Sequence, residues 1–165
     1  MKILETSDKK QDRFLHTKTN ELDLDSFDKE KLRKIIRDMR KVMVDADGIG
    51  LAGNQAGLDL SLFVARENGK FYAVINPKIT KKFGSKYTAR EGCLSVPGFH
   101  GETERYEGVI LEGQGQTGKK IRIKAEGLLA HIFQHEMDHL NGVVYTDHAK
   151  NVTKVNLGKI KNNES

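Results

Sequence analysis

The stretch LLAHIFQHEMDHLNG, residues 128–142, restricts the fold of this chain more than any other. Its apolar residues recur at helical spacing, which predicts a helix with one face in the core. These residues are Leu128, Leu129, Ile132, Phe133, Met137 and Leu140. Asn141-Gly142 is a typical helix end. A helix anchored in this way is a rigid platform for the polar side chains that it also carries.

Within this helix, His135-Glu136-x-x-His139 has the H-E-x-x-H spacing. Residues at i and i+4 share a helix face, so the two imidazoles can converge on one metal ion. Glu136 can lie beside that ion without binding it, which suits a proton shuttle for metal-bound water. The same pattern occurs by chance on surface helices, so by itself it favours a metal site without establishing one.

A third histidine, His131, lies one helical turn before His135. His131 and His139 are about 12 Å apart along a helix axis, whereas metal–nitrogen bonds are about 2 Å long. One ion therefore cannot readily join both of them. A pair of His131 and His135 would leave His139 unused. We expect His131 to be a packing residue or to line the edge of a pocket.

The third metal ligand is expected from another part of the chain, and His100, His148, Cys93 and several acids are candidates. Cys93, the single cysteine, lies in the loop-like stretch REGCLSVPG. A thiolate with two imidazoles makes a good site for zinc or ferrous iron, with one position open for water. His16 and His148 stand in polar surroundings, so we expect them at the surface.

The remaining patterns predict an α+β fold. Residues 26–48 form an amphipathic pattern, with Ser26 as the expected N-cap. Two strand pairs joined by turns are expected: 61–66 with 70–79, and 107–113 with 119–127. Residues 1–24 carry few periodic signals. The polar, basic tail, residues 151–165, is expected to be frayed or to form a short helix.

The 165 residues suit a single catalytic domain spanning residues 1–165. No run approaches the roughly 18 apolar residues of a membrane span, and the N-terminal stretch lacks a signal-peptide core. We therefore expect a cytoplasmic protein without membrane contact. The formal net charge of +5 would suit a ribosome or RNA surface. Acids interrupt most basic stretches, so sequence-specific nucleic-acid binding is not expected.

Three separate motifs occur in the order and spacing typical of the peptide deformylases: GIGLAGNQ (48–55), EGCLS (91–95) and QHEMDH (134–139). INPKI (75–79) and HLNGVVY (139–145) extend the likeness, which covers residues 25–148. The chain thus resembles that family over most of its length. The resemblance implies mixed and antiparallel β-sheets packed around the central helix. It also implies hydrolysis of the formyl group from the N-terminal formyl-methionine of nascent polypeptides, with release of formate.

The resemblance further implies a metal held by Cys93, His135 and His139. Ferrous iron is expected in the cell, and zinc, nickel or cobalt can occupy such a site in purified protein. Glu136 would move the proton between water and the leaving amine. The same likeness assigns the binding of the formyl oxygen to two groups, which are the backbone N–H of Leu94 and the side chain of Gln55.

Substrate binding is implied in the same way. The family adds its peptide as a strand, so Ile49, Gly50 and Gly92 are expected to offer main-chain hydrogen bonds. Leu128 and Ile132, with Ile49, would build the methionine pocket.

Glu91 and Arg105 match a salt bridge of the family that would brace the Cys93 loop. The chain departs from the family pattern at Gly53, where alanine is usual. We expect this glycine to loosen the loop of Gln55. His100 stands near the substrate entrance, where many relatives carry other residues. The preference for residues beyond methionine is therefore open.

Two alternatives stay open at this point. The first is another H-E-x-x-H metallo-amidase or peptidase, which would take His or Glu as third ligand and leave Cys93 free. The second is a non-catalytic basic module that binds the ribosome, which predicts salt-sensitive RNA binding. The lack of aromatic-basic clusters counts against the second. Transient contact of the enzyme with the ribosome, the host and the oligomeric state are not fixed by the sequence.

Overall fold

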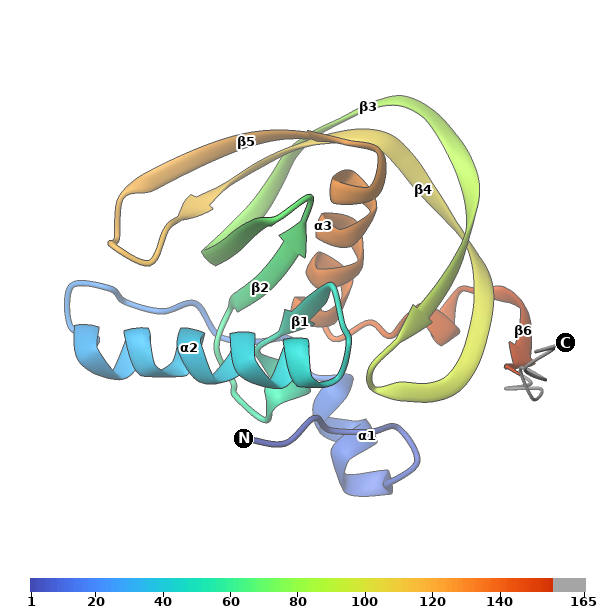
Figure 1. Cartoon of the computed structure of the whole chain (residues 1–165), viewed down its shortest axis with the longest axis horizontal. Coiled ribbons are helices and arrows are strands. Elements are labelled where there is room, and N and C mark those ends of the chain that lie inside the picture. The colour runs from blue at the N-terminus through green and yellow to red at the C-terminus, as the bar shows by residue number, and fades with distance from the viewer. Residues whose placement is uncertain (156–165) are drawn as a thin grey trace, which may run out of the picture.

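A six-stranded antiparallel sheet curves around one helix, α3 (Gly127–Leu140), as Figure 1 shows. The computed structural model describes residues 1–155. Five strands follow the order β1-β2-β3-β4-β5, and β6 pairs with β4. Their bounds are β1 Gly50–Ala52, β2 Leu62–Glu67, β3 Lys70–Cys93, β4 Val96–Gln114, β5 Lys120–Glu126 and β6 Lys150–Lys154. The expected α+β fold around the central helix is confirmed.

The apolar face of α3 forms the main core with the sheet. The Phe133 ring packs against Phe63 of β2 and Tyr72 of β3, with centroid separations of 5.5 and 5.7 Å. Ile132 and Leu140 are buried in the same cluster. The periodicity of the sequence therefore identified the helix correctly, and the helix ends at Asn141 as expected.

Helix α2 (Lys29–Asp45) covers the second part of the core beside β1 and β2. The face that it buries consists of Leu32, Ile36, Met39 and Met43. The carboxylate of Asp28 accepts the N–H of Lys31 and caps the helix. Ser26 was therefore the wrong choice of N-cap; its hydroxyl donates to Asp23 instead.

Both predicted strand pairs are present. β2 and β3 join through Asn68 and Gly69, which both have positive φ, as a tight hairpin turn requires. β4 and β5 pair from Gly108↔Glu126 to Gln114↔Lys120. β3 continues far beyond the predicted residue 79, and it stays paired with β4 through four register shifts. These irregularities bend the long pair around α3.

Three short helices complete the described chain: α1 Lys9–Leu15, and the 3-10 turns η1 Asn54–Ala56 and η2 Tyr145–Asp147. Helix α1, which Asp8 caps, was not predicted from the sequence. The tail prediction was wrong for residues 151–154, because they belong to β6 and pair with β4 near His100. Residues 156–165 of that predicted tail lie outside the described residues. Among residues 1–155, no helix has the length and apolar character needed to cross a bilayer.

Candidate metal centre and substrate cleft

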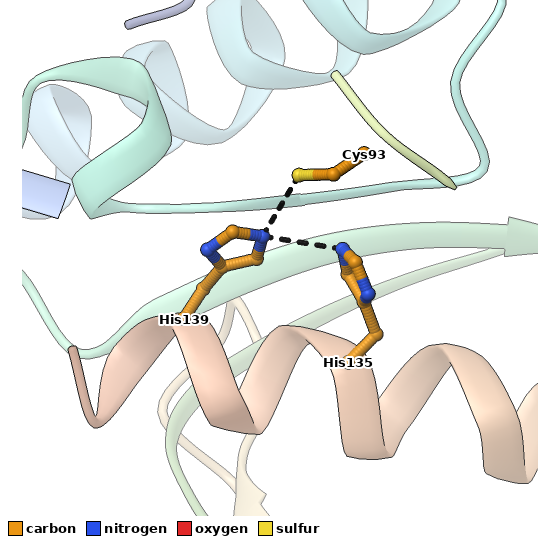
Figure 2. A group of neighbouring side chains, drawn as sticks. All are labelled: Cys93, His135 and His139. Atoms are coloured by element: carbon orange, nitrogen blue, oxygen red, sulfur yellow. Dashed lines mark hydrogen bonds between the residues drawn. The ribbon is translucent and has the colours of Figure 1, made fainter. Parts of the chain in front are cut away.

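The end of β3 and one face of α3 bring together the three predicted ligands. Sγ of Cys93 and the Nε2 atoms of His135 and His139 lie within 4.8 Å of one another. The sulfur is 3.1 Å from His139 Nε2, which is 3.1 Å from His135 Nε2 (Figure 2). The two histidines are adjacent because α3 places i and i+4 on one face. This is the donor set of a thiolate and two imidazoles that suits zinc or ferrous iron.

The ring of His135 is oriented for ligation by its other nitrogen. Its Nδ1 contacts the carboxylate of Glu91, which can only accept, so Nδ1 carries a proton and Nε2 is the nitrogen on the side of His139. Burial lowers the pKa of His139 well below its ordinary value. A neutral imidazole is the form that binds a metal. The residues present therefore fit the metal that the donor set indicates.

Glu91 is the buried hub that supports this arrangement. Arg105 donates to it through Nη2 at 2.7 Å and Nε at 3.0 Å, and Thr103 donates at 2.6 Å. His131 Nε2 lies 2.9 Å from the same carboxylate. Burial alone would raise the pKa of Glu91, but the hydrogen bonds with His131, His135 and Arg105 hold it well below its usual range. The expected Glu91–Arg105 ion pair is thus present.

The other predicted histidines lie outside the cluster of three ligand atoms. His131 lines the cleft and bonds Glu91, which agrees with a pocket-edge position. His148 lies at the surface, 3.4 Å from Asp138, and His16 is also partly exposed. The ring of His100 lies beside Gly92, at a position where a Cβ on the glycine would be 2.7 Å from its Nε2.

Glu136 is buried directly beside the cluster, with a relative exposure of 2%. A Cβ added to Gly50 would lie 2.0 Å from its Oε1, so only glycine lets β1 approach this carboxylate. Its Oε2 has no hydrogen-bond partner within the described residues. Burial raises the pKa of Glu136 to about 7, which suits a group that takes up and gives back a proton near neutral pH.

The side chain of Gln55 is fixed with its amide nitrogen toward the cluster. Ala52 N–H donates to Gln55 Oε1 at 2.8 Å. Gln55 Nε2 then donates to Ser95 Oγ at 3.1 Å and approaches Cys93 Sγ at 3.3 Å. Leu94 lies between Cys93 and Ser95, and it lines the same cleft. Two groups with N–H donors therefore lie beside the candidate metal centre.

The cluster opens into a cleft of about 700 Å³. All of the predicted substrate-contacting residues line it: Ile49, Gly50, Gly92, Leu128 and Ile132. Ile49 and Leu128 are 45% and 53% exposed. Leu128 was placed on the core face by the sequence pattern, but it lies at the mouth of the cleft instead. This apolar surface beside a polar centre is typical of a ligand site.

β1 is the edge strand on which a peptide could be added. Arg66 N–H donates to the carbonyl of Ile49 at 2.9 Å, so this carbonyl is already used in the pairing with β2. In an antiparallel pair, bonded and non-bonded positions alternate. The next position, Gly50↔Ala65, therefore turns its Gly50 N–H and C=O to the open edge. Of Ile49 and Gly50, two of the three predicted main-chain partners, Gly50 is therefore the better placed.

The comparisons with known proteins agree with this geometry. A family model described as polypeptide deformylase matches residues 1–155. The chain belongs to this family. It is 46% identical over 127 residues to a peptide deformylase of Symbiobacterium thermophilum, and this match spans 75% of the chain and 58% of that protein. It is 45% identical over 124 residues to peptide deformylase 1 of Bacillus anthracis, with 73% and 78% coverage.

Solved structures of the deformylase family share the fold. The peptide deformylase of Synechococcus elongatus, in complex with actinonin, superposes with a TM-score of 0.84 at 37% identity. That match covers 92% of this chain and 79% of the other. The enzyme of Thermotoga maritima gives a TM-score of 0.82 at 35% identity, covering 89% and 95%. The recognition made from the three motifs is confirmed.

Gly53, the departure from the deformylase motif, does not loosen its loop. Its N–H donates to Leu62 O, and its carbonyl accepts from Leu58 N–H. A Cβ at Gly53 would lie 2.3 Å from the carbonyl oxygen of Leu60. The expectation of a looser Gln55 loop was therefore wrong, because the neighbouring backbone closes onto the space that an alanine would need.

Sequence reasoning missed two supports of the site. Thr103 donates to Glu91, and Asn54 Nδ2 donates to the carbonyl oxygens of His139 and Leu15. Neither residue stands out in the sequence by type or spacing. Asn54 lies inside the GIGLAGNQ motif, which is the one signal that singles it out. The role of Thr103 becomes visible only when the β3–β4 register is known.

Proposed function

We propose that this chain removes the formyl group from the N-terminal formyl-methionine of nascent polypeptides and releases formate. One observation carries the proposal most directly. Cys93, His135 and His139 converge on one point beside the buried carboxylate of Glu136. Membership of the deformylase family supports the same activity. The alternatives of a different metallo-amidase or of a non-catalytic ribosome-binding module are not favoured.

Cys93, His135 and His139 are the residues that would hold the metal. When bound, a divalent ion supplies a Lewis acid that polarises the formamide carbonyl and lowers the pKa of water. We propose ferrous iron as the ion in the cell. Zinc, nickel or cobalt would occupy the same donors in purified protein.

Glu136 performs the proton transfers. Its carboxylate takes a proton from the attacking water as the new C–O bond forms at the formyl carbon. It then delivers that proton to the methionine nitrogen as the C–N bond breaks, so that formate and a free amino terminus result. The Oε2 atom of Glu136, which has no hydrogen-bond partner within the described residues, supports this role because it leaves an acceptor for the proton.

Gln55 and Leu94 stabilise the negative charge that develops on the formyl oxygen. Gln55 Nε2 is oriented toward the centre because Ala52 N–H binds the other end of the amide. The backbone N–H of Leu94 directly follows the ligand Cys93. Donors fixed before the reaction need no reorganisation as charge develops.

The substrate's methionine occupies the apolar part of the cleft. Ile49, Leu128 and Ile132 contact its side chain, while Gly50 and Gly92 hold its main chain as an added strand. Glu91 and Arg105 act from behind His135 by fixing the ring and the Cys93 loop.

The experiment that tests this function measures formate release from formyl-Met-Ala-Ser by the metal-loaded protein. Turnover of this peptide together with no hydrolysis of acetyl-Met-Ala-Ser supports the proposal. Hydrolysis of internal peptide bonds, or no release of formate, contradicts it. We further propose a cytoplasmic location, where nascent chains emerge. Transient ribosome contact stays a prediction, which cosedimentation with ribosomes at low and high salt would test.

A further inference from the structure

A second cavity adjoins the substrate cleft. Its volume is about 520 Å³, and it lies between the end of α2 and the β2–β3 hairpin. Ile49 and Leu128 line both spaces, so these two exposed apolar side chains form the ridge between them. The second cavity shares no residue with the candidate metal centre. It is therefore an extension of the cleft away from the reacting group.

The walls of this second cavity carry an excess of positive charge. Arg40, Arg66 and Lys70 line it, against one lining acid, Glu67. The Arg66 guanidinium forms an ion pair with the Asp47 carboxylate at 3.2 Å and also donates to the carbonyl of Gly48 at 2.8 Å. The Arg40 guanidinium lies 4.6 Å from the centroid of the Phe71 ring. Within the described residues, Arg40 and Lys70 have no acid at salt-bridge distance, so both cations are available to an added anion.

The positive charge continues along α2. Arg33 and Arg37 are exposed and precede Arg40 at helical spacing, so the three share one face of the helix. Asp38 and Asp45, the acids beyond the first turn, lie on a different face and are bound by lysines of the preceding turn. These acids therefore do not neutralise the arginine face, and its charge adds to the positive potential at the cavity.

The path of the substrate leads to this cavity. The formyl group must lie at Cys93 and Glu136, near Gln55, which follows β1 in the chain. A peptide added along the open edge at Gly50 then leaves in the opposite direction, past Ile49. Alternate residues of an extended strand face the same side, about 6.5 to 7 Å apart. The third residue therefore faces the same side as the methionine, one step beyond the ridge.

We propose that the second cavity binds the side chain of the third residue of the formylated peptide and favours an acidic one. This inference rests on the proposed function and names the class of substrate that the site prefers. Apolar contact with Ile49 and Leu128 would hold the stem of a glutamate, while its carboxylate meets Arg40 and Lys70. A lysine at the same position would be repelled.

The test compares formyl-Met-Ala-X-Ala-amide peptides in which X is Glu, Gln or Lys. The amidated end removes the terminal carboxylate, so X carries the only charge that varies. We expect kcat/KM to fall in the order Glu, Gln, Lys, with about a 3- to 10-fold span between Glu and Lys that arises in KM and shrinks at high salt. The double variant Arg40→Gln/Lys70→Gln should bring the Glu/Lys ratio close to one. The control Lys41→Gln, whose ammonium pairs with Asp45 on the other face, should keep the wild-type ratio.

Equal rates for the Glu and Lys peptides in the wild-type protein would overturn the inference, even if the double variant does not fold. An unchanged ratio in a folded double variant would overturn the assignment to these cations. In both cases turnover of formyl-Met-Ala-Ser would continue, and the proposed function would stand. Absence of turnover on every formylated peptide would instead reject the proposed function, and with it this preference.

Discussion

The carboxylate of Glu91 contacts Nδ1 of His135 on one side and the guanidinium of Arg105 on the other. Glu91 and Arg105 form an ion pair between β3 and β4, and Glu91 links this pair to His135, a candidate metal ligand on α3. The tautomer of His135 follows from this contact, because a carboxylate accepts and Nδ1 must donate. The orientation of the candidate metal ligands therefore depends on a residue outside the ligand set.

Replacing Glu91 tests this dependence. In Glu91→Gln the side chain keeps its shape but loses its charge, and the buried Arg105 retains only Asp138 as an ionic partner. We expect a loss of about 3 to 5 kcal/mol in the free energy of unfolding and about a 10- to 100-fold weaker affinity for zinc. Urea unfolding and a zinc titration measure the two effects. The control Glu112→Gln removes an exposed partner of Arg122 and should change neither. Wild-type zinc affinity in Glu91→Gln would show that the hub does not orient the site.

Glu136 is predicted to be needed for turnover but not for binding the metal. Glu136→Gln keeps the volume beside Gly50 and cannot accept a proton. We expect formate release to fall by about 10²- to 10⁴-fold while the metal content per chain stays at the wild-type level. Near-normal turnover in this variant would refute the proton-transfer role.

Gly53 is predicted to tolerate no side chain. In Gly53→Ala the new methyl group would lie 2.3 Å from the Leu60 carbonyl oxygen, so the backbone must move. We expect a loss of about 1 to 3 kcal/mol in stability and a lower kcat, since the Gln55 loop moves with it. Gly115→Ala is the matched control, because the nearest atom to its Cβ would be 3.6 Å away. If Gly53→Ala were as stable as the wild type, the predicted clash with the Leu60 carbonyl oxygen would be contradicted.

His16 provides a prediction for pH dependence. Burial alone would lower its pKa, but hydrogen bonds with the Asp12 carbonyl and the Asp147 carboxylate raise the pKa above its ordinary value. A raised pKa in the folded state stabilises the protein below the unfolded value of about 6.5, and this contribution is lost as pH rises through the folded value. The stability difference between wild type and His16→Gln should therefore be larger at pH 5.5 than at pH 8.5. Equal differences at both pH values would argue against the ion pair.

The sequence predicts the parts of this protein that depend on local pattern. The spacing of apolar residues identified α3 and α2, and the H-E-x-x-H spacing placed His135 and His139 on one face. Local pattern does not predict the position of Cys93 beside these histidines, because this position depends on the whole course of β3 around α3. Reasoning from residue chemistry left several third ligands open, and the family resemblance selected Cys93.

The features that the sequence missed depend on contacts between distant segments. β6 lies in a mostly polar stretch with one apolar residue, Val152, and becomes a strand because the edge of β4 near His100 pairs with it. Gly53 was expected to give the Gln55 loop more conformational freedom. The Leu58–Leu62 segment instead fills the space beside Gly53. The ridge of Ile49 and Leu128 with the second cavity beyond it also arises only where the end of α2, the β2–β3 hairpin and the start of α3 meet.

The most direct test of the account is whether the sulfur of Cys93 binds the metal. We would load the wild-type protein and Cys93→Ser with cobalt, record the thiolate-to-cobalt charge-transfer absorption, and measure metal content and formate release on the same samples. The account predicts the charge-transfer band and turnover in the wild type, and loss of the band with weaker metal retention and little turnover in Cys93→Ser. Full metal retention and turnover in Cys93→Ser, or a wild-type cobalt protein without the thiolate band, would contradict it.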